Sequence, residues 1–374
     1  MEQNRPPRNE TIDILKGLGI IGVVAGHCTL NRLNSPFLNF LYLFHVAIFF
    51  IASGYCYNPA KTETAEAFKK SISNTFKKLW TRYVLWTILF LALHNVFVYL
   101  NIYTNNPEFI QMVSGDHINT TNYLSFAIII SRMFKSLVFL SGTQLTGALW
   151  FLATLLELIV LYQTIAFILK RFFSKQKVFL IQSILSVLFL GLGYYFAINN
   201  IFLEGYARIP SFYILLHGGF VLKNYSLTEK ERSNIAHFAI WAISLAALVA
   251  CNQFGHIELS CNTYENPLFL IIASFAGWQF LYETATFIKR FNLISRTIKF
   301  INKNAITILA LHFLSFKIIT GLILLIEDLP SFMLASFPVL CDDHFWWIAY
   351  TLVGIAVPCL INTIGAKIGN RQRL

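Results

Sequence analysis

Two ionisable residues, Lys16 and His27, lie in the first apolar stretch of the chain, LKGLGIIGVVAGHC. A helix turns about 100° and rises about 1.5 Å per residue, so side chains at these two positions share one face, about 16 Å apart along the axis. An ammonium group attracts anionic groups of a substrate, and neutral imidazole is a natural base near pH 7. The spacing therefore predicts a helix face with a cation at one end and a general base at the other.

Asp13 and a set of glycines accompany this pair. Asp13 precedes Lys16 by one helical turn, so its carboxylate can accept a hydrogen bond from the lysine and orient it. Small residues keep the same helix slim, namely Gly17, Gly19, Gly22 and Gly26. A slim helix allows either close packing of a neighbouring helix or the passage of a narrow substrate arm. The sequence leaves both interpretations open.

A third candidate, His45, lies near the start of the second apolar stretch, FHVAIFFIASGYCYN. If this stretch runs antiparallel to the first, His45 and His27 lie at comparable depth. Two imidazoles that face one cavity can divide the work, one as the base and the other as an acid or orienting group. The structural alternatives are that Lys16 snorkels to the interface and that His27 is a hydrogen-bonded packing residue.

The composition sets the environment of these residues. Of the 374 residues, 56% are hydrophobic and 13% are charged, which leaves too little polar surface to cover a soluble globule. The apolar segments are about 17 to 25 residues long, the length of a membrane-spanning helix, and they lack the alternation of barrel strands. The sequence thus predicts an all-α polytopic membrane protein.

About ten transmembrane helices are predicted from these segments. They cover residues 12–31, 38–58, 82–103, 148–170, 177–198, 205–223, 234–252, 265–288, 304–327 and 345–366.

Lys and Arg are concentrated in alternate connections between the predicted spans. With the N-terminus in the cytoplasm, all but five of the 29 cations fall on the inner side, the exceptions being Arg32, Arg132, Lys135, Arg208 and Lys317. Inner connections of membrane proteins carry an excess of Lys and Arg. This distribution predicts that both termini are cytoplasmic, and it accounts for the net charge of +11 without a nucleic-acid partner.

The longest outer connection, residues 104–147, contains the stretch NYLSFAIIISRMFKSLVFL, whose apolar character is interrupted by Arg132 and Lys135. We interpret this stretch as a helix that lies in the outer interface or packs over the bundle. No separate soluble domain is visible, so residues 1–374 are predicted to form a single transmembrane domain. The residues CDDH at Cys341–His344 have metal-ligand types but no accompanying partners, so no metal is expected.

Several other polar residues fall inside predicted spans, where charged groups are expensive and usually paired. They are Glu157, His94, His217, Glu283, His312 and Lys317. Each can line a cavity or tie helices together, and for each one we favour the structural role, with more weight on function for His312.

Four stretches of the sequence resemble a known family. IDILKGLGIIGVVAGH and FHVAIFFIASGYCY are similar to the first two signatures of the acyltransferase-3 family of membrane O-acyltransferases, and ALWFLATLL and NAITILALH resemble two later ones. His27 matches the family's histidine, and Lys16 stands where the family usually has an arginine. The resemblance implies that His27 is catalytic and that Lys16 helps to bind the acyl donor.

The same family usually has a pair of arginines in the inner connection before the third helix. Here Arg82 fits one position and Leu79 occupies the other, beside Lys77 and Lys78. A cationic cluster of this kind suits the phosphates of coenzyme A, although attraction to anionic lipid is an alternative. We therefore expect Lys77, Lys78 and Arg82 to contribute to donor binding.

The resemblance implies an acyl-CoA-dependent O-acyltransferase in which acetyl-coenzyme A is the donor substrate. The acceptor is expected to be a hydroxyl of a cell-surface or lipid-linked glycan, and the location the bacterial cytoplasmic membrane. We expect the pantetheine arm to follow the glycine-lined helix face and His27 to act as the general base, with a covalent acyl-histidine route left open. The alternative function is a polytopic transporter or exporter of a polysaccharide or small anion.

Overall fold

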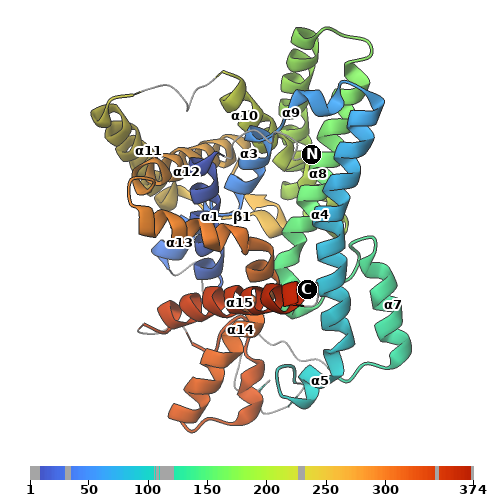
Figure 1. Ribbon diagram of the computed structural model, residues 1–374, viewed down its shortest axis with the longest axis vertical. Helices are drawn as coiled ribbons and strands as arrows, with labels where there is room; N and C mark the ends of the chain where they lie inside the picture. The colour runs from blue at the N-terminus through green and yellow to red at the C-terminus, as the bar shows by residue number, and fades with distance from the viewer. Residues whose placement is uncertain are drawn as a thin grey trace. The chain divides into compact units, whose positions relative to one another are not determined.

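The computed structural model describes residues 9–29, 35–104, 106, 109, 122–225, 232–341 and 345–371. This part of the chain is almost entirely helical (Figure 1). The longer helices are α1 (Glu10–Gly26), α4 (Ala65–Ala92), α7 (Phe126–Ser136), α8 (Trp150–Leu169), α9 (Lys175–Ile198), α10 (Ile209–Asn224), α11 (Asn234–Phe254), α12 (Pro267–Ile288), α13 (Asn292–Lys303), α14 (Ala305–Ile326) and α15 (Trp346–Arg371).

Shorter elements connect these helices. They include α2 (Pro36–Tyr42), α3 (Ala47–Tyr55), α5 (His94–Tyr99) and the 3-10 turns η3 (Gln144–Leu149) and η6 (Ser331–Ala335). Between α11 and α12 a two-residue strand β1 (Ile257–Glu258) pairs antiparallel with β2 (Thr263–Tyr264), in the register Ile257 to Tyr264 and Glu258 to Thr263. The predicted all-α class is confirmed.

Polar side chains fix the starts of several helices after the connections. The Thr64 side chain accepts a hydrogen bond from the Ala67 N–H at the start of α4, and the Asn266 side chain accepts one from the Phe269 N–H at the start of α12. Such caps satisfy backbone donors that have no partner within the helix, and each stabilises the helix by about 1 kcal/mol. The apolar runs that follow form the spans themselves.

Seven helical stretches of the described chain are long and apolar enough to cross a membrane. They are Pro36–Tyr55, Gln144–Leu169, Lys175–Ile198, Asn234–Phe254, Pro267–Ile288, Ala305–Ile326 and Trp346–Ile368. Each coincides with a predicted span, and the protein is an integral, multi-pass membrane protein.

The other three predicted spans are helical but shorter or divided. α1 has 17 residues and α10 has 16, and the predicted span 82–103 is divided between the end of α4 and α5. The count of ten and the cytoplasmic placement of both termini stay predictions.

The chain forms two compact units, which we call unit 1 and unit 2. Unit 1 contains Met1–Val23, Pro36–Pro59 and Leu169–Ala305, and unit 2 contains Val24–Ser35, Ala60–Ile168 and Ile306–Leu374. α1 therefore belongs to unit 1 except for its last residues. The single domain over residues 1–374 stays a prediction.

In unit 1, α3 packs closely against α10. A Cβ atom at Gly54 would collide with the Leu216 carbonyl, and one at Gly219 would collide with the Ile51 carbonyl. The two glycines thus allow each backbone to touch the other, which is the usual way for membrane helices to gain packing contacts.

At the start of α1, the side chain of Lys299 on α13 donates to the Glu10 carboxylate, and this hydrogen bond lowers the pKa of Glu10.

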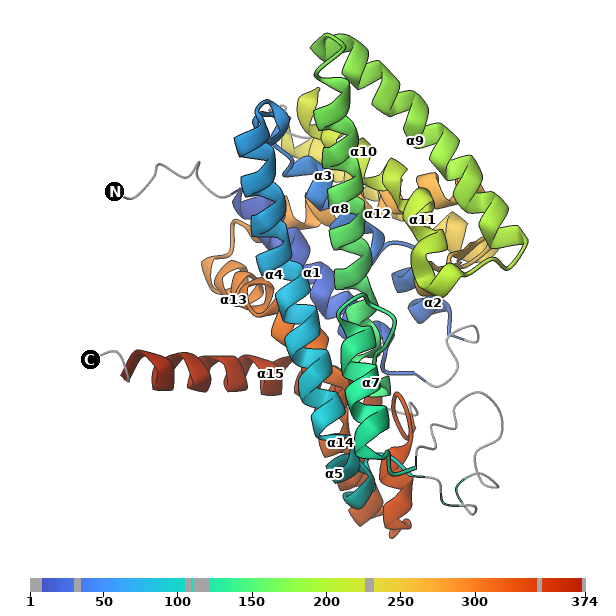
Figure 2. The same cartoon turned by 90° about the vertical axis from the view of Figure 1, so that its right-hand side faces the viewer.

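In unit 2, α4 and α8 lie side by side (Figure 2). The Ser71 hydroxyl donates to Gln163 Oε1 at 2.8 Å, and the ring of Phe68 stacks on that of Phe167 with centroids 4.5 Å apart. α7 packs on α4, where Trp80 Nε1 donates to the carbonyl of Leu137, just beyond α7, at 2.8 Å. A helix is therefore present within the outer segment 104–147, and its placement at the membrane interface stays a prediction.

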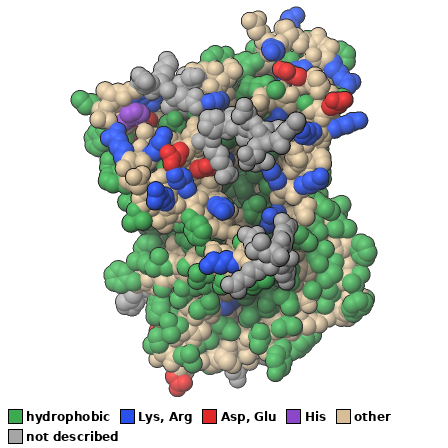
Figure 3. Space-filling view, viewed as in Figure 1, with side chains coloured by type: hydrophobic (Ala, Val, Ile, Leu, Met, Phe, Trp, Pro, Cys, Tyr) green, Lys and Arg blue, Asp and Glu red, His purple; other side chains and the backbone are tan. Residues whose placement is uncertain are grey.

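The surface of each unit reflects its environment. In unit 2 the face over α14 and α5 is almost wholly hydrophobic, and Leu325 at the end of α14 is 83% exposed (Figure 3). In unit 1, Lys and Arg side chains gather around the ends of α12 and α13 (Figure 3). An apolar surface of this extent is stable only when lipid or another protein covers it.

The contact between α3 and α10 generates a stability prediction. Gly54→Ala should lower the stability of the purified protein in detergent by about 1–3 kcal/mol, because the added methyl group meets the rigid Leu216 backbone. The matched control is Gly191→Ala on α9, where no atom lies within 4 Å of the added Cβ, so the better helix propensity of alanine should leave stability equal or higher. Thermal melting measures both, and equal melting temperatures for the two variants would contradict the close contact.

Candidate active site

His27 and His312 stack on each other in unit 2. Their ring centroids are 5.4 Å apart with an interplanar angle of 27°. The ring of Phe313 lies beside both histidines, with centroids 4.9 Å from that of His27 and 4.1 Å from that of His312. Of the nine histidines, these two come from opposite ends of the chain, at the end of α1 and in the middle of α14.

His312 is held rigidly within α14. It is fully buried, and its Nδ1 lies 2.9 Å from the Ile308 carbonyl one turn earlier. A carbonyl oxygen only accepts, so Nδ1 carries the proton and Nε2 presents a lone pair in the neutral ring. This Nε2 is buried and has no hydrogen-bond partner among the described residues. An unsatisfied buried acceptor costs about 1–3 kcal/mol, so packing alone does not account for it.

His27 lies just beyond the end of α1. Its backbone N–H donates to the Val24 carbonyl at 3.2 Å, which tightens the chain into a turn after Gly26. The predicted helix over residues 12–31 therefore ends early, and the turn sets the direction of the His27 ring, where helical periodicity was expected to set it. The ring is half-buried, whereas that of His312 is enclosed.

The neighbour Cys28 anchors this turn. Its thiol donates to the Val24 carbonyl at 3.1 Å and lies 3.4 Å from the Thr351 hydroxyl of α15. α15 approaches closely here, because a Cβ atom at Gly354 would come within 2.5 Å of the ring of Phe316. The end of α1, α14 and α15 thus meet around the two histidines.

Aromatic side chains shelter the histidine pair. Phe316 lies edge-on to His312 with centroids 5.6 Å apart, and Phe337 lies 4.7 Å from Phe313. An aromatic face within about 6 Å of a cation stabilises it by about 0.5–2 kcal/mol. The Phe313 ring is close enough to His27 to stabilise a positive charge on that imidazole.

Lys317, five residues after His312, has a structural role. It is buried, and its Nζ donates to the carbonyls of Leu334 at 2.9 Å and Ser336 at 2.6 Å. These contacts tie η6 and the residue that follows it to α14, as the structural interpretation predicted. Other polar residues also bridge elements: His217 Nε2 lies 2.9 Å from the Ser183 hydroxyl, and His94 Nε2 lies 3.1 Å from the Asn122 carbonyl.

The cation of the opening motif, Lys16, lies in unit 1 and is half-buried on α1. Asp13 Oδ1 accepts a hydrogen bond from the Asn302 amide at 3.1 Å, so the carboxylate helps to join α1 to α13. Its predicted contact with Lys16 stays a prediction.

The glycines of α1 serve packing. A Cβ atom at Gly17 would meet the Ile298 carbonyl of α13, and one at Gly19 would meet Ile48 and Phe49 of α3. Neighbouring helices thus occupy the space beside these two glycines. Of the two interpretations, close packing holds for both positions, and the expected passage of a substrate arm along them is wrong.

His45 also belongs to unit 1. The predicted helix over residues 38–58 is interrupted there, because α2 ends at Tyr42 and α3 begins at Ala47. His45 is buried in this turn, with Nδ1 2.8 Å from the Leu41 carbonyl and the Tyr42 ring 4.5 Å from its own. Its pairing with His27 stays a prediction, and His312 is the imidazole that the structure brings to His27.

The cationic residues expected at the donor lie on α4 in unit 2. Lys77, Lys78 and Arg82 are all exposed, and Lys78 and Arg82 are one helical turn apart on the same side. Their side chains can reach an anionic ligand at the surface. Exposed lysine and arginine side chains lose little hydration when they bind such a ligand.

Some of these contacts escape sequence reasoning. Phe313 adjoins a noted histidine but carries no signal of its own, and the contact between Cys28 and Thr351 joins the two ends of the chain. His237, which bonds to the flagged Glu283, was not singled out at all. The stretch that ends at His312 was the one sequence signal for this part of the site. Only the fold shows that the His312 ring contacts that of His27.

Comparisons with known proteins add one match. A family model described as an acyltransferase domain of the acyltransferase-3 type matches residues 9–363, nearly the whole chain and both units. Neither a curated protein nor a solved structure matches the chain.

The unsatisfied acceptor of His312 generates a prediction. His312→Phe keeps an aromatic ring and removes the buried Nε2. The free energy of unfolding should therefore stay equal or rise by up to about 1–3 kcal/mol, and the melting temperature should stay equal or rise with it. His217→Phe is the matched control, because it removes a buried imidazole that is paired with Ser183, and it should lower the melting temperature. A His312→Phe variant destabilised as much as His217→Phe would show that Nε2 has a structural partner.

Proposed function

The chain belongs to the acyltransferase-3 family of membrane acyltransferases, and from this premise we propose that it transfers an acetyl or similar acyl group from acyl-coenzyme A to a glycan hydroxyl. Membership makes it an enzyme that transfers acyl groups within a membrane. The proposed acceptor is a cell-surface or lipid-linked glycan, and the proposed location is the bacterial cytoplasmic membrane.

The stacked pair of His27 and His312 is the observation that supports this proposal. A base for acyl transfer needs access to substrate, a fixed orientation and an environment that tolerates its protonated form. His27 is half-buried, its ring contacts those of His312 and Phe313, and the aromatic ring of Phe313 is close enough to stabilise the imidazolium. This combination of partial exposure and rigid support is what a general base requires.

The reaction then proceeds by direct transfer. His27 takes the proton of the glycan hydroxyl while the hydroxyl oxygen attacks the thioester carbonyl carbon, forming a C–O bond. The C–S bond breaks, and the coenzyme leaves as a thiolate that recovers the proton from the His27 imidazolium, so no net charge is left on the protein. The ring of His312, whose buried Nε2 has no partner among the described residues, stacks on His27 and supports its orientation.

Donor binding is assigned to cations. Lys16 on α1 and the exposed Lys77, Lys78 and Arg82 on α4 carry the positive charge that a coenzyme with several phosphates requires. Asp13 orients Lys16, and His45 assists as a second orienting or acidic group. A transporter has no need of a sheltered base, and it would neither hydrolyse nor transfer a labelled acyl group.

His27→Ala should abolish acyl transfer, with a loss of about 10²–10⁴-fold in kcat, because general base catalysis contributes about this much. Transfer of label from radiolabelled acetyl-coenzyme A to membrane glycan, or its hydrolysis, measures the effect on purified protein. His256→Ala, which replaces an exposed histidine paired with Glu265 in unit 1, is the matched control and should keep full activity. Transfer that persists in a folded His27→Ala protein would remove His27 from the chemistry.

Lys16→Ala should weaken donor binding by about tenfold and change kcat little, because a hydrogen bond to a charged group contributes about 1.5–3 kcal/mol. The double variant Lys77→Ala, Lys78→Ala should weaken donor binding by up to about fivefold for each lysine removed, because an exposed ion pair contributes up to about 1 kcal/mol. Calorimetric titration with acetyl-coenzyme A gives both dissociation constants.

Lys16→Arg restores the residue usual in the family and should bind the donor at least as tightly as the parent. Arg296→Ala on α13 removes an exposed cation outside the proposed donor set and is the control. Equal dissociation constants for the control and the Lys16→Ala variant would reduce Lys16 to a boundary cation.

A further inference from the structure

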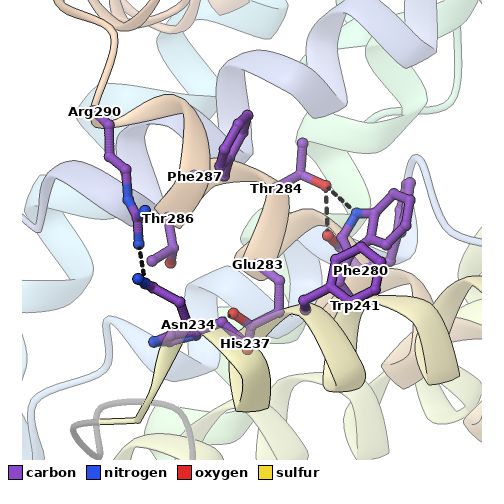
Figure 4. Close-up of a pocket in the computed structure, with 10 residues that line it drawn as sticks. Asn234, His237, Trp241, Phe280, Glu283, Thr284, Thr286, Phe287 and Arg290 are labelled. Carbon is purple, nitrogen blue, oxygen red and sulfur yellow. Dashed lines mark hydrogen bonds and ion pairs between the residues drawn. The ribbon is translucent and has the colours of Figure 1, made fainter.

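A cavity of about 540 Å³ lies between α11 and α12 in unit 1 (Figure 4). We call it the α11–α12 pocket. Its lining is formed by Asn234, His237, Phe238, Trp241, Phe280, Glu283, Thr284, Thr286, Phe287 and Arg290. None of the residues assigned above to catalysis or donor binding belongs to this lining.

One side of the pocket is an aromatic wall. Phe238 is 67% exposed and Phe287 is 58% exposed, so both rings are open to the surroundings of the protein. The Trp241 ring contacts two further aromatic rings of the wall, with centroids 5.9 Å from that of Phe238 and 5.6 Å from that of Phe280. α11 is also the least buried of the seven candidate spans, with 17% of its most apolar window inside the protein. In a membrane protein an aromatic surface of this kind faces hydrocarbon.

The other side is polar and rigid. Glu283 is buried and fully engaged, because His237 Nδ1 lies 2.6 Å, Gln279 Nε2 2.7 Å and Arg232 Nη1 3.3 Å from its carboxylate oxygens. Glu283 therefore has little capacity left for a cationic ligand. Trp241 is fixed in the same way, since its indole N–H donates to the Thr284 hydroxyl at 3.1 Å.

Arg290 supplies positive charge at this end, and no carboxylate of the described residues forms an ion pair with it. It is exposed, and its Nη2 donates to Asn234 Oδ1 at 2.7 Å, which leaves further guanidinium N–H groups to bind an anion (Figure 4). The first turn of α11, which begins at Asn234, adds the partial positive charge of a helix N-terminus. Among the described residues at this end of the pocket, Arg232 and Arg290 carry two positive charges against the one carboxylate of Glu283.

The two ends together define an amphipathic site at a membrane surface. The polar end lies where α11 begins and α12 ends, and the connection after α12 carries Lys289 and Arg290 and is expected on the cytoplasmic side. The aromatic wall continues from there along the spans. Indole and phenyl rings at this depth typically mark the boundary between headgroups and acyl chains.

We propose that the α11–α12 pocket binds an anionic phospholipid of the cytoplasmic leaflet. Arg290 and the start of α11 hold the phosphate, and one acyl chain lies along Phe238, Trp241 and Phe287. Free phosphate would leave the aromatic wall unused, and a cationic ligand would meet Arg290. The site is separate from the acyl-transfer chemistry, so its test needs no enzymatic activity.

Native mass spectrometry of the delipidated full-length protein in detergent tests the proposal. Long-chain phosphatidylglycerol should remain bound at concentrations where phosphatidylcholine and inorganic phosphate do not. Arg290→Ala should weaken phosphatidylglycerol binding by about fivefold, which corresponds to about 1 kcal/mol for one cation at the membrane surface. Arg296→Ala removes an exposed arginine that does not line the pocket, and it should bind as the parent does.

The role of the aromatic wall is tested by substitutions in the protein and by changing the acyl-chain length of the lipid. Phe287→Ala should weaken binding, whereas Phe254→Ala, at the far end of α11 and 81% exposed, should not. Short-chain phosphatidylglycerol should bind the unmodified protein more weakly than the long-chain form, a result that does not depend on any variant folding. Equal binding of phosphatidylcholine and phosphatidylglycerol, or equal binding of inorganic phosphate and long-chain lipid, would overturn the proposal.

Discussion

Inside a bilayer every polar group must find its hydrogen-bonding partner within the protein, because hydrocarbon offers none. This requirement explains most polar residues of the spans. Lys317 donates to the carbonyls of Leu334 in η6 and of Ser336 just after it, and Glu283 binds three donors from α11, α12 and the chain before α11. These contacts offset the cost of burying polar groups and hold the helices together. A buried polar atom without a partner therefore stands out.

His312 is such an exception. Its Nδ1 is engaged by its own helix, and its Nε2 is buried without a partner among the described residues. The residue stacks on His27, which is the histidine that matches the family signature. The unpaired Nε2 lowers the stability of the fold at the place where the chemistry is expected. Local features that lower stability are typical of functional sites. The exception thus connects the packing of α14 with the function of the family.

The first helix contributes to this arrangement by being fixed. Its glycines let α13 and α3 approach the α1 backbone, and Glu10 and Asp13 bond to Lys299 and Asn302 on α13. Gly17 and Gly19 thus leave room for neighbouring helices, and Asp13 contributes to the contact between α1 and α13. Within unit 1 these contacts give α1 a defined position.

The sequence by itself determined the membrane class, seven of the spans and the family, because hydropathy and the motif around His27 are properties of consecutive residues. It also predicted a catalytic role for His27, which stays a prediction, and drew attention to His312. Only the tertiary structure decided that α1 ends at Gly26, that the glycines pack, and that His312 and Phe313 meet His27. These contacts join residues from distant parts of the chain, and their geometry follows from how α1, α14 and α15 pack, which no local pattern encodes.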